Sequence, residues 1–372
     1  MKRAAAGILT MMVVMACCAV GVKAQEPRFS NAKVQSRSAA ASLESEFRGI
    51  VAAQESPAWI GYSVPVLGEH QMCCWNSTDS YRNSGGCCGG CRLEGSNEVT
   101  FNNSDENRSV KLEGPQNMLV LFRVVGKSVE KIRMFSEDCA IDAGGLPVYW
   151  LAEVKPAESV ALLATFVRAG GPGTIESDDD KPSRRRANAA VSAIALHADA
   201  SADGVLESFI APSQSEWLRG QTAFWLGSAR ERRGYDILKR MVREDPSERV
   251  RDKVVFALSV SKVPESVDTM IAVAREDASK RVRGQALFWL GQKAGKKAVE
   301  AISSAIEDDP DTDIKKKAVF ALSQLPKDEG VPLLIQVAKT NKNPAVRKQA
   351  MFWLGQSNDS RALSFFEQVL KQ

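Results

Sequence analysis

Cysteines are the residues whose type and spacing most directly suggest chemistry. Beyond residue 24 there are six, all before residue 140: Cys73, Cys74, Cys87, Cys88, Cys91 and Cys139. Cys88 and Cys91 have the Cys-x-x-Cys spacing of metal and redox sites, and His70 lies close to them in sequence, so both interpretations stay open. In an exported chain, an even number of cysteines instead predicts structural disulfides. Six cysteines allow 15 pairings, and the sequence does not choose among them.

Other catalytic signatures are missing. The chain has two histidines, His70 and His197, which excludes a histidine-rich metal site. It contains no phosphate-binding loop, Gly-x-Gly-x-x-Gly, His-Glu-x-x-His or Gly-x-Ser-x-Gly motif. We therefore predict no catalytic residues and no cofactor, and expect the chain not to be an enzyme. The alternative is an enzyme, or a metal or redox protein, with its site in the Cys73–Cys91 region.

The first 24 residues have the pattern of a targeting segment. Lys2 and Arg3 precede an uncharged stretch over 4–22, and Val22-Lys23-Ala24 fits the small-x-Ala pattern of signal-peptide cleavage. We predict that residues 1–24 are a signal peptide and that the protein is exported, either to a bacterial periplasm or into the medium. Val14-Met15-Ala16-Cys17 also resembles a lipobox, so a lipid on Cys17 is one alternative and an uncleaved membrane anchor is another.

Composition divides the mature chain into two parts. The 372 residues are 44% hydrophobic and 25% charged, which is typical of globular proteins and excludes wholesale disorder. Residues 25–182 carry a net charge of −6, whereas residues 183–372 carry +7. Glycine, proline and dense charge over 169–186 predict an exposed linker between the parts. The polar stretch 25–42 predicts a flexible leader.

The first part, residues 43–168, has the pattern of a small disulfide-stabilised α+β domain. Apolar residues at helical spacing over 43–51 predict an amphipathic helix. Apolar, β-branched runs over 118–125 and 129–135 flank Gly126-Lys127 and predict a hairpin, and residues 59–66 and 148–151 predict further strands. A closing helix begins near Pro156.

The second part, residues 187–372, is a repeat array. Phe224, Phe256, Phe288, Phe320 and Phe352 are each 32 residues apart, and Leu238, Met270, Ile302, Leu334 and Phe366 keep the same interval. Trp-Leu-Gly and Ala-Leu-Ser alternate after the phenylalanines, which adds a period of 64. A period in this range predicts an all-α solenoid. We expect about six units of two helices each.

One family resemblance follows from these units. Val282-Arg283 through Leu290-Gly291, and Val346-Arg347 through Leu354-Gly355, resemble HEAT repeats, and most closely the short HEAT-like repeats of bilin lyases. Val250-Arg251 matches too, although Ser259 replaces the glycine. The resemblance covers about half of the chain. It implies an armadillo-like helical solenoid, but little about function, because this fold serves many activities.

The solenoid supplies the candidate binding residues. The phenylalanine column, Phe224, Phe256, Phe288, Phe320 and Phe352, either grips a partner peptide on the concave face or packs between units. The lysines Lys253, Lys316, Lys317 and Lys348 either form a positive stripe beside it or belong to a solvated face. We predict a scaffold that binds a protein, with an acidic partner favoured by charge, and no nucleic acid. A purely structural envelope component is the alternative. If the signal peptide does not stay as an anchor, we expect membrane attachment only through a possible lipid on Cys17.

Overall fold

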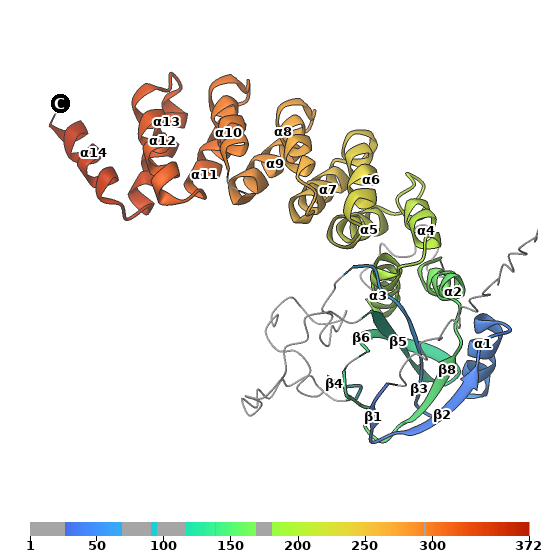
Figure 1. Ribbon diagram of the computed structural model, residues 1–372. Coiled ribbons are helices and arrows are strands. Elements are labelled where there is room, and N and C mark those ends of the chain that lie inside the picture. The colour runs from blue at the N-terminus through green and yellow to red at the C-terminus, as the bar shows by residue number, and fades with distance from the viewer. Residues whose placement is uncertain are drawn as a thin grey trace, which may run out of the picture.

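The computed structural model describes residues 27–68, 91–94, 116–137, 139–168, 181–293 and 295–371. A mixed five-stranded sheet, ordered β2-β8-β3-β5-β6, organises the first part (Figure 1). A smaller three-stranded sheet, ordered β1-β7-β4, lies beside it. The strands are β1 (Phe29–Ser30), β2 (Lys33–Ser38), β3 (Ala58–Pro65), β4 (Cys91–Arg92), β5 (Asn117–Val125), β6 (Ser128–Ser136), β7 (Ile141–Asp142) and β8 (Pro147–Ala152).

Alternation along β5 separates two hydrophobic cores. Met118, Val120 and Phe122 face the core that α1 (Leu43–Ala53) and α2 (Pro156–Arg168) cover, whereas Leu119 and Leu121 face the core beneath the small sheet. Both faces of the sheet are therefore buried at β5. The predicted helix over 43–51, the hairpin around Gly126-Lys127 and the helix beginning near Pro156 are confirmed.

Two boundary predictions are wrong. The stretch 25–42, expected to be a flexible leader, contains β1 and β2, and β2 pairs in parallel with β8 along its whole length. All six residues of β2 are exposed, so backbone hydrogen bonds hold this edge strand and hydropathy gives no signal of it. The predicted linker 169–186 ends too late, because the first solenoid helix already begins at Lys181.

The second part is a solenoid of helix pairs that extends away from the sheets (Figure 1). Within the described residues it comprises twelve helices in six pairs, which confirms the expected count. They are α3 (Lys181–Leu196), α4 (Ser201–Phe209), α5 (Glu216–Ala229), α6 (Glu231–Glu244), α7 (Glu248–Val260), α8 (Glu265–Glu276), α9 (Lys280–Lys293), α10 (Lys296–Asp308), α11 (Thr312–Ser323), α12 (Lys327–Thr340), α13 (Pro344–Gln356) and α14 (Ser360–Leu370).

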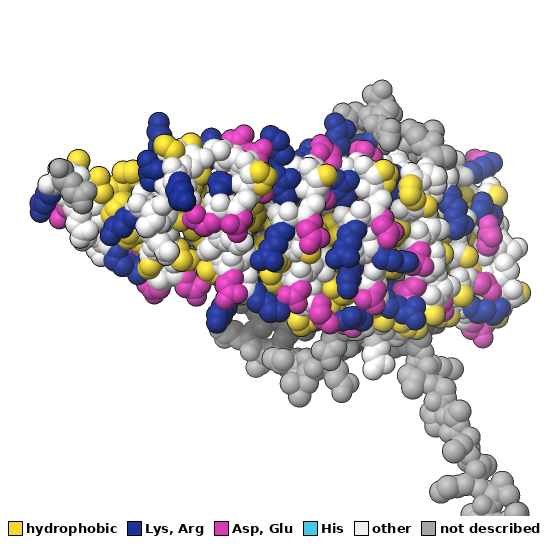
Figure 2. Space-filling view, turned by 90° about the horizontal axis from the view of Figure 1, so that it is seen from above, with side chains coloured by type: hydrophobic (Ala, Val, Ile, Leu, Met, Phe, Trp, Pro, Cys, Tyr) yellow, Lys and Arg dark blue, Asp and Glu magenta, His cyan; other side chains and the backbone are white. Residues whose placement is uncertain are grey.

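Odd-numbered and even-numbered helices form separate rows. In Figure 1, α6, α8 and α10 lie above α7, α9 and α11. Seen from above in Figure 2, this side of the solenoid carries positive and negative side chains interspersed with apolar ones, without a large patch of one sign. No helix in the described ranges combines the length and apolarity that crossing a bilayer would require.

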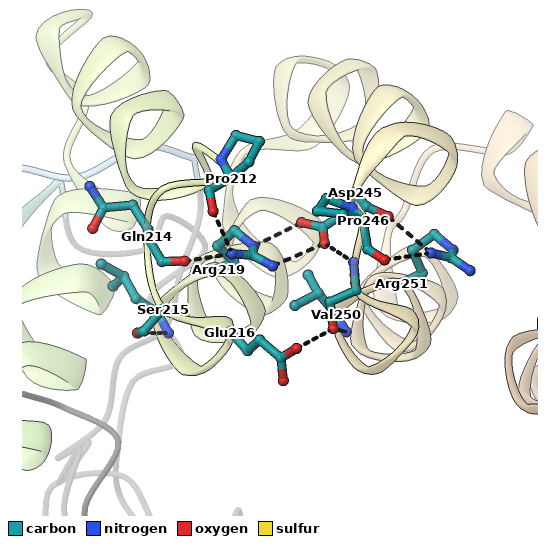
Figure 3. Close-up of polar contacts among 11 residues, drawn as sticks. Pro212, Gln214, Ser215, Glu216, Arg219, Asp245, Pro246, Val250 and Arg251 are labelled. Atoms are coloured by element: carbon teal, nitrogen blue, oxygen red, sulfur yellow. Dashed lines mark hydrogen bonds and ion pairs between the residues drawn. The ribbon is translucent and has the colours of Figure 1, made fainter. Parts of the chain in front are cut away.

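A ladder of arginine–aspartate pairs joins consecutive units. Arg219 of α5 donates to both carboxylate oxygens of Asp245, over 2.9 and 3.1 Å (Figure 3). Asp245 lies in the turn before α7, and its carboxylate also accepts from the backbone N–H of Ser247 at 2.9 Å. Arg251 of α7 donates to the Asp245 carbonyl at 2.9 Å and to the next carboxylate, that of Asp277. Each arginine therefore binds the turns on both sides of its own unit.

The ladder repeats with the 32-residue period and then weakens. Arg283 pairs with Asp309 at 3.1 Å, in the same manner as Arg251 with Asp277. In the next unit Lys315 replaces the arginine and Asn341 replaces the aspartate. The ladder's charge pairing therefore belongs to the units nearest the sheets.

We predict that Asp245→Asn destabilises the protein by about 3 kcal/mol. The Arg219 and Asp245 side chains are only 5% and 2% exposed, so the substitution leaves a buried guanidinium without its counter-charge. Denaturant unfolding measures the change. Asp313→Asn is the control, because Asp313 pairs with Lys316 at the surface and its loss is expected to cost less than about 0.5 kcal/mol. Equal costs for the two variants would contradict the structural importance of the ladder.

Candidate functional site

An aromatic row runs along the odd-numbered helices. It comprises Phe224, Trp225, Phe256, Phe288, Trp289, Phe320, Phe352 and Trp353. Phe224 stacks on Phe256 with 5.8 Å between ring centroids, and Phe256 contacts Trp289 at 4.9 Å. The same pattern returns 64 residues later, where Phe288 stacks on Phe320 and Phe320 contacts Trp353. The rings therefore form one continuous series across five units.

These contacts show where the phenylalanine column lies. Each of its side chains packs against a ring in the neighbouring unit or in its own, which agrees with the packing interpretation. Phe224, Phe256, Phe288 and Phe320 are nevertheless only half-buried, and Phe352 is 54% exposed. The row thus has an inner edge that packs and an outer edge open to solvent. Partner binding by these residues stays a prediction.

A column of glutamines and lysines lies one helical turn before the phenylalanines. This Gln/Lys column consists of Gln221, Lys253, Gln285, Lys317 and Gln349. Lys253 crosses over Gly220 and Lys317 over Gly284, where an added Cβ would lie 2.3 and 2.4 Å from the lysine Cδ atoms. Glycine is therefore what lets each lysine stem lie flat against the preceding odd-numbered helix.

A cleft of about 690 Å³ opens at the solenoid end nearest the sheets. Its lining residues are Arg184, Glu216, Trp217, Arg249, Lys253 and Arg281, and we call it the cationic cleft. All except Lys253 lie in the first turns of α3, α5, α7 and α9. The N-terminal ends of four helices thus add their positive partial charges to four cationic side chains.

Within the cationic cleft, Lys253 is the positive charge that is least neutralised by nearby carboxylates. Burial lowers the pKa of Lys253, the carboxylates of Glu216 and Asp252 oppose that shift, and the charges of Arg184 and Arg281 add to it. Among the described residues, no carboxylate forms an ion pair with Lys253. The Arg281 guanidinium donates to the Asp252 carboxylate at 3.0 Å. The Arg249 guanidinium lies 3.9 Å from the Glu216 carboxylate, and both of these side chains are exposed.

Of the three other predicted lysines, only Lys316 forms an ion pair within the described residues. Lys280 bonds Asp311 at 2.6 Å, and Lys316 bonds Asp313 at 3.2 Å. Lys317 and Lys348 are exposed on α11 and α13, outside the cationic cleft. Sequence reasoning found Lys253 but missed Arg184, Trp217 and Arg249, because these converge only when four helices pack. The one sequence signal for Arg184 is the run Arg184-Arg185-Arg186, which falls within the predicted linker.

A buried polar cluster ties the two parts of the chain together. Ser159 of α2 donates to the Tyr62 hydroxyl of β3 at 2.9 Å, and His197 Nε2 lies 3.1 Å from Ser159 Oγ. All three residues are completely buried, so a substrate has no access to this serine–histidine pair. The backbone around His197 also bonds to the end of β3, through Ala198 N–H to Pro65 O at 3.0 Å. The cluster therefore joins the five-stranded sheet to the start of the solenoid.

The ionisation of His197 links this cluster to stability. Burial lowers the pKa of His197 to about 4; Asp199 opposes the shift and Arg230 contributes to it. Below pH 6.5 the unfolded chain binds a proton at this residue while the folded chain stays neutral. The free energy of unfolding therefore falls as pH drops from 6.5 towards about 4.

We predict a loss of about 2 kcal/mol from this residue between pH 7 and pH 5. His197→Gln removes the titrating group while keeping an amide near Ser159, so its stability declines less steeply over that range. Denaturant unfolding at several pH values compares the two proteins. Parallel pH profiles would show that His197 does not titrate as its burial requires.

The predicted cysteine site lies almost wholly outside the described residues. Cys73, Cys74, Cys87, Cys88 and His70 are among the residues not described, and only the backbone of Cys91 is described, in β4. Cys139 is completely buried in the core beneath the small sheet. Within the described ranges, no group of three metal-ligating side chains occurs. The disulfide, metal and redox interpretations stay predictions.

Comparison with known proteins identifies the solenoid. The family model of HEAT repeats matches residues 202–291, 267–329 and 299–372. Residues 202–372 are HEAT repeats. The HEAT array thus begins close to α4 and continues to the last described helix, and the resemblance inferred from the sequence is confirmed. No curated protein matches the chain significantly.

Several solved structures are similar to the chain at low identity. The CpcE–CpcF complex of phycocyanin lyase from Nostoc is 21% identical, with a TM-score of 0.32, and the match covers 42% of this chain and 99% of that one. Human deoxyhypusine hydroxylase in complex with glycerol is 19% identical, with a TM-score of 0.24 and coverages of 58% and 84%. Lipovitellin is 13% identical, with a TM-score of 0.39 and coverages of 56% and 24%.

Proposed function

We propose that this protein is an exported scaffold without catalytic activity, which binds a protein partner along the odd-numbered helices of its HEAT array. The observation that carries the proposal is the continuous, half-buried aromatic row across five units. A series of partly exposed rings gives a partner apolar contact area in every unit. The Gln/Lys column beside it gives hydrogen-bond donors at the same spacing.

The repeat geometry suits an extended partner segment. Neighbouring packed helices lie about 8–10 Å apart, and an extended chain advances about 3.3 Å per residue. About three partner residues therefore correspond to one unit. In a polyproline II chain, which has three residues per turn and advances about 3.1 Å per residue, every third side chain lies on the same side and meets a ring and an amide or ammonium group of the next unit. The even-numbered row, with its interspersed charges, offers no comparable series on the side seen in Figure 2.

Site-specific photo-crosslinking tests the proposal. We expect a crosslinker placed at Gln285, on α9 beside Phe288, to yield a defined adduct in the cell envelope. The same group at the exposed Glu300, on α10 of the other row, is the control and is expected to yield none. Adding Phe352→Ser is expected to reduce the adduct at least threefold while leaving the melting temperature nearly unchanged, because Phe352 is largely exposed. Equal adducts at Gln285 and Glu300 would refute binding by this row.

Export rests on residues 1–24, which lie outside the described residues. The charged start, the apolar stretch and the Val22-Lys23-Ala24 site support it. Intact-mass measurement of the protein from native cells tests it: a chain beginning at Gln25 is expected. A mass corresponding to a lipid-modified chain starting at Cys17 would replace that expectation with membrane anchoring, and a full-length chain would contradict processing.

A further inference from the structure

One repeat position of the cationic cleft changes its charge along the odd-numbered helices. Arg249 and Arg281 occupy the same position in consecutive units, and that position is Asp313 in the next unit and Ala345 in the last. The positive series therefore stops after α9. At this repeat position, positive charge is confined to α7 and α9 and does not continue to α11 and α13.

Lys253 lies where the cationic cleft meets the aromatic row. It lines the cleft and also belongs to the Gln/Lys column, one turn before Phe256. Its stem is held against Gly220, so the ammonium group has a defined position on the surface of α5. A ligand in the cleft thus lies next to the first rings of the row, at Phe224 and Phe256.

We propose that the cationic cleft binds a stretch of acidic residues in the partner protein, with carboxylates at Lys253, Arg249 and Arg281. This inference rests on the proposed function, because it specifies the chemistry of the partner segment that enters the odd-numbered row. Charge complementarity identifies the occupant: Lys253, Arg249 and Arg281 line the cleft beside one lining carboxylate, Glu216, and Asp252 pairs with Arg281 at 3.0 Å, which leaves a positive excess centred on Lys253.

The distribution of the cations favours an extended acidic chain over a single phosphate group. The charged side chains come from α3, α7 and α9 rather than converging as a fork around one point. Four adjacent helices about 8–10 Å apart span roughly 24–30 Å, which corresponds to about eight extended residues. Trp217 forms an apolar wall, with Arg184 held over its ring at 5.9 Å, and suits side chains that alternate with the carboxylates.

The probe for this inference is a fluorescein-labelled octaglutamate peptide, with labelled octalysine as the negative control. Fluorescence anisotropy with the full mature chain is expected to show that octaglutamate binds. The affinity is expected to fall as the NaCl concentration rises from about 50 to about 300 mM, because salt in this range screens attraction between exposed charges. Lys253→Gln is expected to weaken it about fivefold. Glutamine already occupies the equivalent position at Gln221, Gln285 and Gln349, so the substitution keeps a side chain that the repeat accepts.

Lys317→Gln is the matched control. It removes one positive charge at the same repeat position 64 residues later, over Gly284, and outside the cationic cleft. Octaglutamate affinity is expected to stay within twofold of the unsubstituted protein. If both substitutions weaken binding equally, the attraction is a general effect of net charge and the proposal fails. It also fails if neither does, or if the peptide does not bind.

Two further outcomes would assign the cleft to another occupant. Equal or tighter binding of a labelled octathymidylate, with the same loss in Lys253→Gln, would show a phosphate site. Binding of octaglutamate only after Asp178, Asp179 and Asp180 are changed to asparagine would show that the chain's own acidic run competes for the cleft. Each result would overturn the assignment to a partner segment.

Failure of this inference is distinguishable from failure of the proposed function. If the row binds a partner but the cleft does not bind acidic residues, the crosslink at Gln285 persists in Lys253→Gln while octaglutamate fails to bind. If the proposed function is wrong, the Gln285 adduct is absent even in the unsubstituted protein.

Discussion

The buried pairing of Arg219, Arg251 and Arg283 with the aspartate of the following turn is the constraint on which the first units of the HEAT array depend. The carboxylate of Asp245 accepts from Arg219 and caps its own turn, while its carbonyl accepts from Arg251. Rotation or sliding of one unit against the next would break these bonds and leave charges buried. The ladder therefore fixes the register in which Phe224 stacks on Phe256, and with it the spacing of the side chains displayed by α5, α7, α9 and α11.

The 64-residue alternation gives this regular frame two kinds of unit. Gly227 and Gly291 lie against backbone carbonyls of Ala257 and Ala321, where an added Cβ would be 2.2 and 2.8 Å away. These tight approaches join the same helix pairs as the phenylalanine stacks Phe224–Phe256 and Phe288–Phe320. The Phe256–Trp289 contact instead spans the junction from α7 to α9. The same alternation places Lys253 and Lys317 over glycines. Aromatic side chains and lysines therefore repeat once per pair of units. For this reason the phenylalanine stack and the lysine–glycine contact between α5 and α7 recur between α9 and α11.

The sequence predicts those features of the structure that repeat along the chain, and it misses those that occur once. The repeat unit recurs every 32 residues, and this one chain contains enough copies of it to reveal the solenoid, its helix count and the phenylalanine column that begins at Phe224. The edge strand β2 is exposed on both faces and depends on hydrogen bonds to β8, so no side-chain pattern marks it. The cationic cleft is invisible for another reason: Arg184 and Trp217 occur once each in their roles, and their proximity arises only from packing between α3 and α5.

The junction with the sheets explains why the cleft lies at this end of the array. A solenoid's first unit exposes an apolar side unless something covers it. Here α3 packs against β6 and α2, and the buried contact between Ser159 and His197 closes the seam. The sheet domain thus acts as the cap of the HEAT array and holds α3 in line with α5. Because Arg184 belongs to α3, the geometry of the cationic cleft depends on this cap.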